Sequence, residues 1–298
     1  MFEFKNMYYH FKKIIILILL HTFLISVALS CIYPLLWMLN VSFKTEQQFR
    51  EDYGMKLASP PTLENYNKVI FEEKLGSYFI NSVFYTFVTV FFIVIFSSLA
   101  AYAFARLNFP GKNVIFFMFL AAMMIPLPAG FVPVYILLNK FFVLFNTAFP
   151  FLKPYSIAER SGYIFAMVNM GLSLSIYLLK TFFDQLPRDL EDAARIDGCN
   201  RLQIWWNVGL PLVAPALAVV IIFNAMTVWN EFVLASLMFT EDNLMPLQVG
   251  LMEIYNRNII QHTLIMAALA LAALPIILLY LKMQKQIIKG LTAGAVVG

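Results

Sequence analysis

Charge and cysteine are both scarce in this sequence. Only 13% of its 298 residues are Asp, Glu, Lys or Arg, whereas soluble domains carry about a quarter. So little charge argues against a disordered hub and against a nucleic-acid-binding surface. The two cysteines, Cys31 and Cys199, are too few for a disulfide framework or a thiolate metal site. What abounds is apolar: 61% of the residues are hydrophobic and the mean hydropathy is +0.77, which indicates an integral membrane protein.

Catalytic motifs are missing as well. No G-x-x-x-x-G-K-[ST] loop occurs, because Gly111-Lys112 is followed by Asn113 and lacks the upstream glycine. No G-x-S-x-G elbow occurs, and the histidines lie far apart with no metal-binding spacing. The only carboxylate inside an apolar span is that of Glu231. We therefore expect no ATP site in this chain, no enzymatic activity and no redox or metal cofactor.

Six stretches are apolar over the roughly 20 residues that a helix needs to cross a hydrocarbon core of about 30 Å. Helices are favoured over strands, because a membrane β-barrel shows alternating segments of about ten residues. The sequence predicts an all-α membrane protein with an N-terminus (1–13), a six-span domain (14–284) and a C-terminal tail (285–298). The predicted spans are Ile14–Leu39, Ser77–Ala105, Val114–Asn139, Ser161–Leu179, Leu212–Phe239 and His262–Leu281.

The distribution of Lys and Arg orients these spans. Both termini lie on a side that holds 12 Lys and Arg against 6 Asp and Glu, whereas the other side holds 9 against 10. Basic residues favour the cytoplasmic side, so we expect both termini in the cytoplasm. The first apolar run continues through Leu39, which is too long for a signal peptide, and in Ala28-Leu29-Ser30-Cys31 a leucine stands where a cleavage box needs a small residue. We therefore expect an uncleaved anchor.

The cytoplasmic loop 180–211 is longer than a simple connection needs, and its pattern predicts two short helices. Pro187 suits the initial position of the first helix. Acidic side chains, which the helix dipole favours near a helix start, then follow at Asp189, Glu191 and Asp192. A small apolar stripe at helical spacing is formed by Leu190, Ala193 and Ala194.

The second predicted helix of this loop begins after Gly198, which is well placed to end the first helix in a left-handed conformation. Asn200 can cap the second helix, with Gln203 three residues later as in a capping box. A bulky face at the membrane surface follows, formed by Leu202, Trp205 and Trp206. Pro211 leads into the fifth span.

Such a loop can act as a knob that enters a groove on a partner protein, since small side chains allow close approach and the acidic start can meet basic residues. The alternative is an amphipathic helix that lies on the bilayer. Surface-seeking helices are usually rich in Lys and Arg, whereas this one is acidic, which favours docking to a protein.

The same loop resembles the EAA loop of ATP-binding-cassette (ABC) importer permeases. That pattern is E-A-A, three residues, G, nine residues, then I-x-L-P. Here it reads Asp192-Ala193-Ala194, Gly198 and Val208-Gly209-Leu210-Pro211 with the same spacing. The chain departs from the pattern by Asp for Glu at 192 and by Val for Ile at 208.

Other segments resemble the maltose-type, multiple-sugar permeases in particular, and the second of their two permease subunits. The resemblance extends from about Tyr33 to the end of the chain. The segments that carry it are Asn81-Ser82, Ala101–Arg106, Phe109–Lys112 and the C-terminal Gly290–Gly298.

This resemblance implies a set of partners and roles. It implies a second permease chain, two cytoplasmic ATPase subunits that hydrolyse ATP, and a binding protein that delivers the sugar from outside. It assigns ATPase docking to Asp192, Ala193, Ala194, Gly198, Leu210 and Pro211. It also implies that the tail Gly290–Gly298 reaches the ATPase interface, although its composition equally fits a disordered end.

Two further segments are candidates for the sugar pathway. The family loop that corresponds to Met252–Arg257 reaches toward the binding protein's sugar cleft, and Tyr255 and Asn256 suit stacking and hydrogen bonding to a sugar; an ordinary polar loop has the same composition. Asn230 and Glu231 either line the translocation path or, with Trp229, belong to the interfacial belt.

Our interpretation is therefore a permease subunit of an ATP-driven sugar importer in the cell membrane. The alternative is a stand-alone secondary carrier in which Glu231 couples transport to protons. A third possibility is an enzyme or a structural membrane protein with no ATPase attached.

Overall fold

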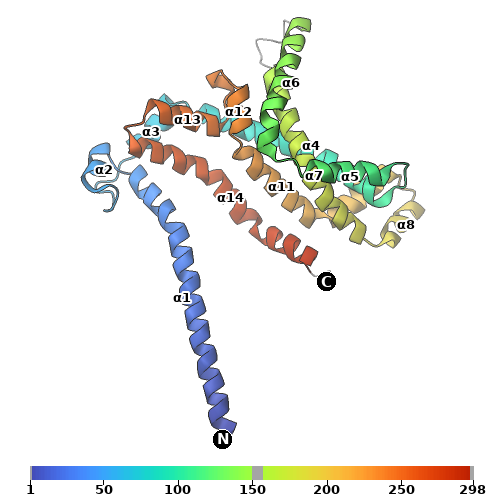
Figure 1. Cartoon of the computed structure of the whole chain (residues 1–298), viewed down its shortest axis with the longest axis horizontal. Coiled ribbons are helices and arrows are strands. Elements are labelled where there is room, and N and C mark those ends of the chain that lie inside the picture. Colours follow the sequence, from blue (N-terminus) through green and yellow to red (C-terminus); the bar gives the residue numbers. More distant parts are fainter. Residues whose placement is uncertain (1, 150–156, 296–298) are drawn as a thin grey trace. The chain divides into compact units, whose positions relative to one another are not determined.

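The computed structural model describes residues 2–149 and 157–295, and within these ranges every regular element is a helix (Figure 1). The elements are α1 (Phe2–Ser42), α2 (Glu46–Asp52), α3 (Glu64–Asn67), η1 (Lys68–Glu72), α4 (Leu75–Arg106), α5 (Lys112–Ala122), α6 (Leu127–Ala148), α7 (Ile157–Gln185), α8 (Arg188–Ile196), α9 (Arg201–Ile204), η3 (Trp205–Gly209), α10 (Leu210–Leu212), α11 (Ala214–Trp229), α12 (Val233–Met238), η4 (Asp242–Leu244), α13 (Leu247–Arg257) and α14 (His262–Ala295).

The chain divides into two compact units. Unit 1 is Met1–Glu73 with Ile254–Leu271, and unit 2 is Lys74–Glu253 with Ala272–Gly298. Unit 1 therefore holds the first helix and the segment that follows it, whereas unit 2 holds the loop between α7 and α11.

Four helices of the described residues are long and apolar enough to cross a membrane, and a bent pair of helices brings the number to five. The four are Lys12–Ser42, Leu75–Arg106, Ile157–Gln185 and His262–Lys285. They contain the first, second, fourth and sixth predicted spans. The bent pair is Arg201–Leu212 and Ala214–Trp229, which meet at an angle of 81° where the fifth predicted span begins.

The third predicted span, Val114–Asn139, is not one continuous helix. It is divided between α5 and α6, with a break after Ala122. Pro126 stands at the start of α6 in an extended conformation, with φ −64° and ψ 123°. Proline has no backbone N–H to donate and pushes the residue before it out of the helical region, so the helix ends before Pro126 and a new one begins after it.

The fifth predicted span, Leu212–Phe239, is also interrupted. Its helix α11 ends at Trp229, and the shorter α12 begins at Val233. The intervening residues leave backbone N–H groups at the start of α12 that the helix itself cannot satisfy. The side chain of Glu231 satisfies two of these groups.

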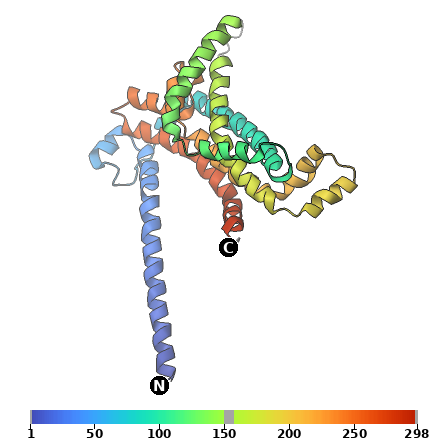
Figure 2. The same cartoon turned by 45° about the vertical axis from the view of Figure 1, so that its right-hand side comes forward.

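Unit 2 is built around α4, α7 and α11, which run side by side (Figures 1 and 2). The three helices meet at Gly171 of α7. A Cβ atom at this position would lie 2.4 Å from Ile93 Cδ1 of α4 and 2.4 Å from Asn224 Oδ1 of α11. Asn224 also donates from Nδ2 to Ser175 Oγ of α7 at 2.9 Å. The close approach of these helices therefore depends on a residue without a side chain at 171.

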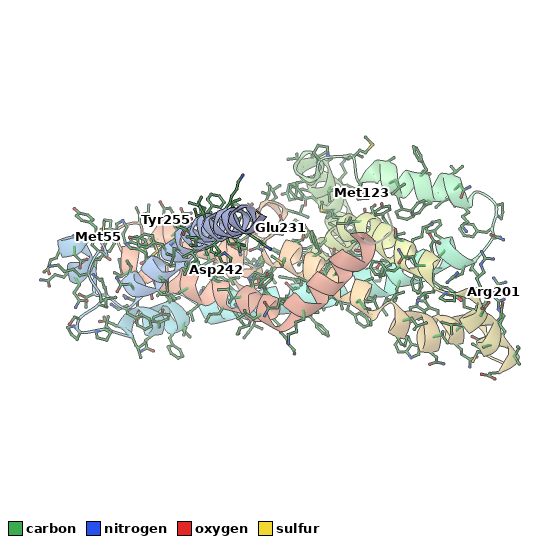
Figure 3. The ribbon with its side chains drawn as sticks, turned by 90° about the horizontal axis from the view of Figure 1, so that it is seen from below. Met55, Met123, Arg201, Glu231, Asp242 and Tyr255 are labelled. Carbon is green, nitrogen blue, oxygen red and sulfur yellow. The ribbon has the colours of Figure 1, made fainter. Side chains whose placement is uncertain are left out.

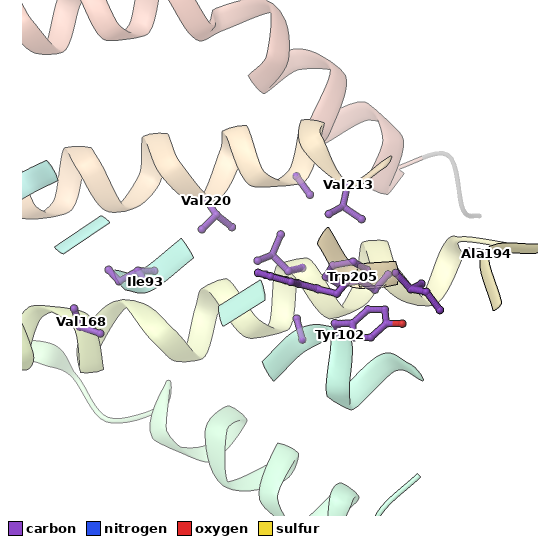
Figure 4. Close-up of a cluster of buried hydrophobic side chains, with 12 residues drawn as sticks. Ile93, Tyr102, Val168, Ala194, Trp205, Val213 and Val220 are labelled. Carbon is purple, nitrogen blue, oxygen red and sulfur yellow. The ribbon is translucent and has the colours of Figure 1, made fainter. Parts of the chain in front are cut away.

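The buried cluster of unit 2 continues from these helices into the loop that follows α7. Figure 4 shows Ile93, Val168 and Val220 at one end of the cluster and Ala194 and Trp205 at the other. The apolar core thus reaches the loop helices and packs them against the spans.

Unit 1 is organised around a buried lysine just after α1. Lys44 is 1% exposed, and its Nζ lies 2.6 Å from Oδ2 of Asp52. The hydrogen bond from Lys44 holds the pKa of the Asp52 carboxyl below its usual range. Asn65 donates from Nδ2 to the carbonyl oxygens of Ser42 and Lys44, at 2.9 and 2.8 Å. These bonds fix the chain where it leaves the first span.

Gly171→Ala tests the close contact of α4, α7 and α11. Because the added methyl group meets two atoms at 2.4 Å, we expect a loss of stability of about 1–3 kcal/mol, as is typical of overpacked cores. The measurement is thermal unfolding of the purified chain in detergent.

Gly209→Ala is the matched control, because the nearest atom to a Cβ there is Phe183 Cε1 at 3.1 Å. We expect a smaller loss of stability for this variant. Equal melting temperatures for the two variants would contradict the packing described for Gly171.

Candidate functional site

The loop between α7 and α11 folds as the sequence predicts, as two short helical segments joined by a tight turn. Helix α8 follows Pro187 directly, so the proline stands one position before the first helical residue. Gly198 has φ +83°, a left-handed conformation that favours glycine. Asn200 and Gln203 form the predicted capping box: Gln203 N donates to Asn200 Oδ1 at 2.9 Å, and Asn200 N donates to Gln203 Oε1 at 2.8 Å.

One face of α8 is turned into the protein. Glu191 and Ala194 are buried, and Ala194 belongs to the apolar cluster of unit 2 (Figure 4). The resemblance assigns Ala194 to docking; its side chain packs in the chain's own core, and a docking role for it stays a prediction. The phase of the helix places Ala194 there, since residues three apart share a face and Glu191 is held inside.

Glu191 is the centre of a buried polar network. Its Oε1 lies 2.8 Å from Nε of Arg106, at the end of α4, and both side chains are at most 10% exposed. Arg106 also donates from Nη2 to the carbonyl oxygen of Leu186 at 2.5 Å. Tyr102 of α4 donates from its hydroxyl to Glu191 Oε2 at 3.4 Å. The network therefore joins α8 both to α4 and to the end of α7.

The opposite face of α8 is open. Asp192 and Ala193 are exposed, and Asp192 Oδ1 accepts a hydrogen bond from Arg195 Nη1 at 2.9 Å. Ile196 is 87% exposed, which is unusual for an isoleucine, and Leu190 is 43% exposed. This outer face (Leu190, Asp192, Ala193 and Ile196) combines a carboxylate with apolar and small side chains, which suits insertion into a groove.

The second half of the loop divides its bulky residues between core and surface. Trp205 is buried, whereas Trp206 and Leu202 are more than half exposed. Leu210 packs against the apolar cluster, and Pro211 is exposed in the short helix α10. Of the loop's predicted docking residues, Leu210 therefore has a structural contact within the chain, while Pro211 remains accessible.

Glu231 lies in the break between α11 and α12 and is 8% exposed. Its Oε1 accepts a hydrogen bond from Leu234 N at 2.6 Å, and its Oε2 accepts one from Ala235 N at 3.0 Å. Tyr163 of α7 donates from its hydroxyl to Oε2 at 3.2 Å. The carboxylate thus satisfies the N–H groups at the start of α12, as a helix cap does.

A cavity of about 130 Å³ also reaches Glu231. Its lining is mainly apolar, from α6, α7 and α11, with Asn224 and Thr227 as further polar residues. Glu231 is therefore both a structural cap and part of a cavity wall. In the described parts of the chain, no group of three or more His, Cys, Asp and Glu side chains is arranged to hold a metal ion.

The other predicted pathway residues are all exposed. Asn230 is exposed, and its Nδ2 donates to the carbonyl oxygen of Met226 at 2.9 Å. Tyr255 and Asn256 lie on the last turn of α13, a helix where the sequence suggests a loop. Arg201, the first residue of α9, lies well apart from Glu231 in Figure 3. The candidate docking loop and the candidate pathway are therefore separate places in unit 2.

The segment 243–247, between α12 and α13, is held by polar side chains of α4. Asn81 donates from Nδ2 to the carbonyl oxygens of Asn243 and Met245, at 2.8 and 3.0 Å. Tyr85 donates from its hydroxyl to the carbonyl oxygen of Leu244 at 2.9 Å. Ser82 Oγ accepts a hydrogen bond from Leu247 N at 2.7 Å. The Asn81-Ser82 pair that contributes to the sequence resemblance thus fixes the backbone of a distant connection.

Sequence reasoning misses three features of this site. It does not pair Glu191 with Arg106, although an arginine at the end of a span and a glutamate in a loop predicted on the same side of the membrane are a charge pair that could have been tested. It does not single out Ile196, although the residue falls at helical spacing from Asp192. It does not assign a function to Tyr102.

Comparison with known proteins supports the resemblance of the chain to permeases. A sequence model of the family described as "Binding-protein-dependent transport system inner membrane component" matches residues 93–292. The putative ABC transporter permease protein ORF2 of Caldicellulosiruptor sp. is 36% identical over 89% of this chain and 91% of that protein. The trehalose/maltose transport system permease protein MalG of Thermococcus litoralis is 32% identical over 92% of this chain and 94% of that protein.

The fold has a counterpart among solved structures. A chain of a bacterial ABC transporter involved in the import of the acidic polysaccharide alginate aligns with a TM-score of 0.75 and 23% identity, over 90% of this chain and 95% of that one. The long apolar helices, the family match and these relatives lead to one conclusion. The chain is a multi-pass membrane protein that belongs to the family of binding-protein-dependent transport system inner membrane components, which are permease subunits rather than enzymes.

Proposed function

We propose that this chain is the permease subunit of an ATP-driven importer of sugars or oligosaccharides, and that the loop between α7 and α11 transmits motion from an ATPase. The observation that carries the proposal is the division of α8 into an inner face bonded to Arg106 and an outer face that presents Asp192 and Ile196. The relatives named for trehalose and maltose, starch degradation products and diacetylchitobiose support a carbohydrate substrate.

The outer face of α8 supplies the contacts with the ATPase. Ala193 allows close approach, Ile196 and Leu190 fill an apolar groove, and Asp192 meets a basic residue of the partner. Gly198 turns the chain so that the second helical segment lies beside the first, and Pro211 lies on the exposed part of that segment. Displacement of α8 by the partner then moves the residues bonded to its inner face.

The inner face passes that displacement to the spans. Glu191 is bonded to Arg106 of α4, and Arg106 is bonded to the end of α7 through Leu186. A buried, charge-assisted pair is stiff because breaking it leaves an uncompensated charge away from water. Helices α4 and α7 therefore follow α8 when it moves.

The importer needs further components. These are a second permease subunit, two cytoplasmic ATPase subunits that hydrolyse ATP, and an extracytoplasmic binding protein that delivers the sugar. The loop is then cytoplasmic, as are both termini, in agreement with the distribution of Lys and Arg. Side chains beyond residue 285 lie outside the described residues, so contact of the C-terminal tail with the ATPase stays a prediction.

As residues near which the sugar passes, we propose Asn230 and Glu231 of unit 2 and, separately, Tyr255 and Asn256 of unit 1. Support for Glu231 comes from its place in the wall of the cavity between α6, α7 and α11. The side chains of Asn230, Tyr255 and Asn256 are exposed and carry groups that can bond sugar hydroxyl groups. A proton-coupled carrier is the less suitable function, because both oxygens of Glu231 already accept hydrogen bonds from the start of α12.

Asp192→Lys tests docking of the loop. Because the side chain is exposed and outside the core, we expect normal membrane insertion but loss of the ATPase from the complex purified in mild detergent. Mass spectrometry of the co-purified subunits measures this. Glu241→Lys, the same charge reversal at an exposed residue between α12 and α13, is the control and should keep the ATPase. Retention of the ATPase by both variants would exclude the proposed docking role of Asp192.

Arg106→Ala tests the transmission of motion. Breaking the buried pair costs about 3–5 kcal/mol. Because Ala194 still packs α8 against the apolar cluster, we expect the ATPase to remain bound while the sugar transported per ATP hydrolysed falls. Transport and ATP hydrolysis are measured together in proteoliposomes. Removal of both charges in Arg106→Ala with Glu191→Ala should be less damaging than the sum of the two single changes.

Asp184→Ala is the control for this pair, because it removes only the exposed i,i+4 pair with Lys180, which is worth about 0.3–0.5 kcal/mol. Coupling in this variant should be normal. Strictly additive effects at Arg106 and Glu191 would show that the pair does not act as a unit.

Glu231→Gln separates a capping role from proton coupling. The amide oxygen of Gln still accepts a backbone N–H, so we expect ATP-dependent transport to remain within a few-fold of the unchanged protein. Glu231→Leu removes the cap and should lower the melting temperature. If Glu231→Gln abolishes transport while the melting temperature is unchanged, the carboxylate has a chemical role that capping does not explain.

A further inference from the structure

The segment 53–58, here called the foot, exposes three large apolar side chains in unit 1. Tyr53 is 71% exposed, Met55 is 79% exposed and Leu57 is 84% exposed. Met55 is labelled in Figure 3. Apolar side chains of this size are unfavourable in water, and a group of them on a surface usually marks contact with a protein or a membrane.

The backbone of the foot is held in place by the side chain of Asn40, at the end of α1. Its Nδ2 donates to the carbonyl oxygens of Gly54 and Lys56, at 3.0 and 2.8 Å. Its Oδ1 accepts a hydrogen bond from Ala58 N at 2.9 Å. Both the amino group and the carbonyl oxygen of the Asn40 side chain therefore bond to the foot. The foot cannot rearrange to bury its apolar side chains without losing these hydrogen bonds.

A second clamp comes from Asp52. Its Oδ1 accepts a hydrogen bond from Gly54 N at 2.8 Å, and its Oδ2 accepts one from Lys56 N at 3.3 Å. The same carboxylate is bonded to the buried Lys44. The acid that holds the backbone of the foot is thus itself fixed by a buried base, and the exposed side chains are attached to a rigid backbone.

Close packing defines the position of the foot along the first span. Gly54 has φ +80°, and a Cβ there would lie 2.6 Å from Val41 Cγ2 and 2.7 Å from Trp37 Nε1. The foot therefore folds back beside the last turn of α1. From Trp37 to Val41 the helix rises about 6 Å, so the foot lies at the level of this last part of α1.

We propose that the foot inserts Tyr53, Met55 and Leu57 into the headgroup–acyl boundary of the leaflet at the C-terminal end of α1, with phospholipid as the occupant of this surface. Tyrosine suits that boundary because it has an apolar ring and a polar end. Lys56, exposed between Met55 and Leu57, reaches the lipid phosphates. The foot then fixes the depth at which the first span ends.

The position of the foot beside the last turn of α1 favours lipid over a protein partner. The apolar run of α1 continues through Leu39, and side chains from Ile14 to Leu36 are exposed around the helix. This apolar, exposed surface is suited to lipid, and it continues to the level to which the foot returns. A docking surface for a soluble partner would instead project beyond the end of the helix. This inference is independent of the substrate and of the ATPase.

Site-directed spin labelling of the full chain in liposomes tests the foot. Cys31 and Cys199 are replaced by alanine, and single cysteines are placed at Met55 and Leu57. Glu51→Cys is the matched control, since Glu51 is exposed on α2 just before the foot. Oxygen concentrates in the bilayer and a nickel chelate stays in water, so their collision rates report depth. We expect the ratio of oxygen to nickel collisions to be several-fold higher at 55 and 57 than at 51.

A second comparison tests what the foot does. A label at Leu39 should move toward water when Met55→Asp and Leu57→Asp are combined, and should not move when the two residues are exchanged as Met55→Leu and Leu57→Met. Equal nickel accessibility at 51, 55 and 57 would overturn the proposal. So would burial of 55 and 57 that occurs only after a substrate-binding protein is added, because the surface would then belong to a protein interface.

Discussion

The buried pair of Arg106 and Glu191 determines what the loop between α7 and α11 can present to a partner. Glu191 is drawn inward by the guanidinium, and Ala194, one turn later, follows it into the core. Because α8 is a rigid helix, Asp192 and Ile196 must then point outward. A pair of charges inside the protein thus sets the chemistry of a surface outside it. The stripe of alanines that the sequence suggests as a contact face is divided, with Ala193 exposed and Ala194 buried.

The breaks in the third and fifth predicted spans follow from a related constraint. A helix in an apolar environment must satisfy its terminal N–H groups within the protein. At the start of α12 the carboxylate of Glu231 does this. At the start of α6, Pro128 falls in the first two helical positions and has no N–H, so one of the donors that the helix cannot satisfy is absent. Glu231, a charged residue inside the fifth predicted span, therefore marks a break between two helices as well as a candidate pathway.

Much of this structure was predictable because its determinants are local. The capping box of Asn200 and Gln203 and the left-handed turn at Gly198 depend on residues a few positions apart, and both are confirmed. The length of the apolar runs predicts α1, α4, α7 and α14 correctly. The two adjacent acids Glu191 and Asp192 could not be told apart, because which one faces inward depends on Arg106, far away in the chain. The division of the third span was missed for a similar reason: a proline inside a helix either kinks or ends it, and the choice depends on the packing of its neighbours.

The hydrogen bonds between α4 and the segment 243–247 have a consequence for variation among relatives. Asn81, Ser82 and Tyr85 bond only to backbone atoms of that segment, at Asn243, Leu244, Met245 and Leu247. Backbone groups are the same whatever side chains the segment carries. The exposed Asn243 can therefore be exchanged by mutation while the course of the segment is kept, whereas the buried Leu244, Met245 and Leu247 are constrained by their packing as well.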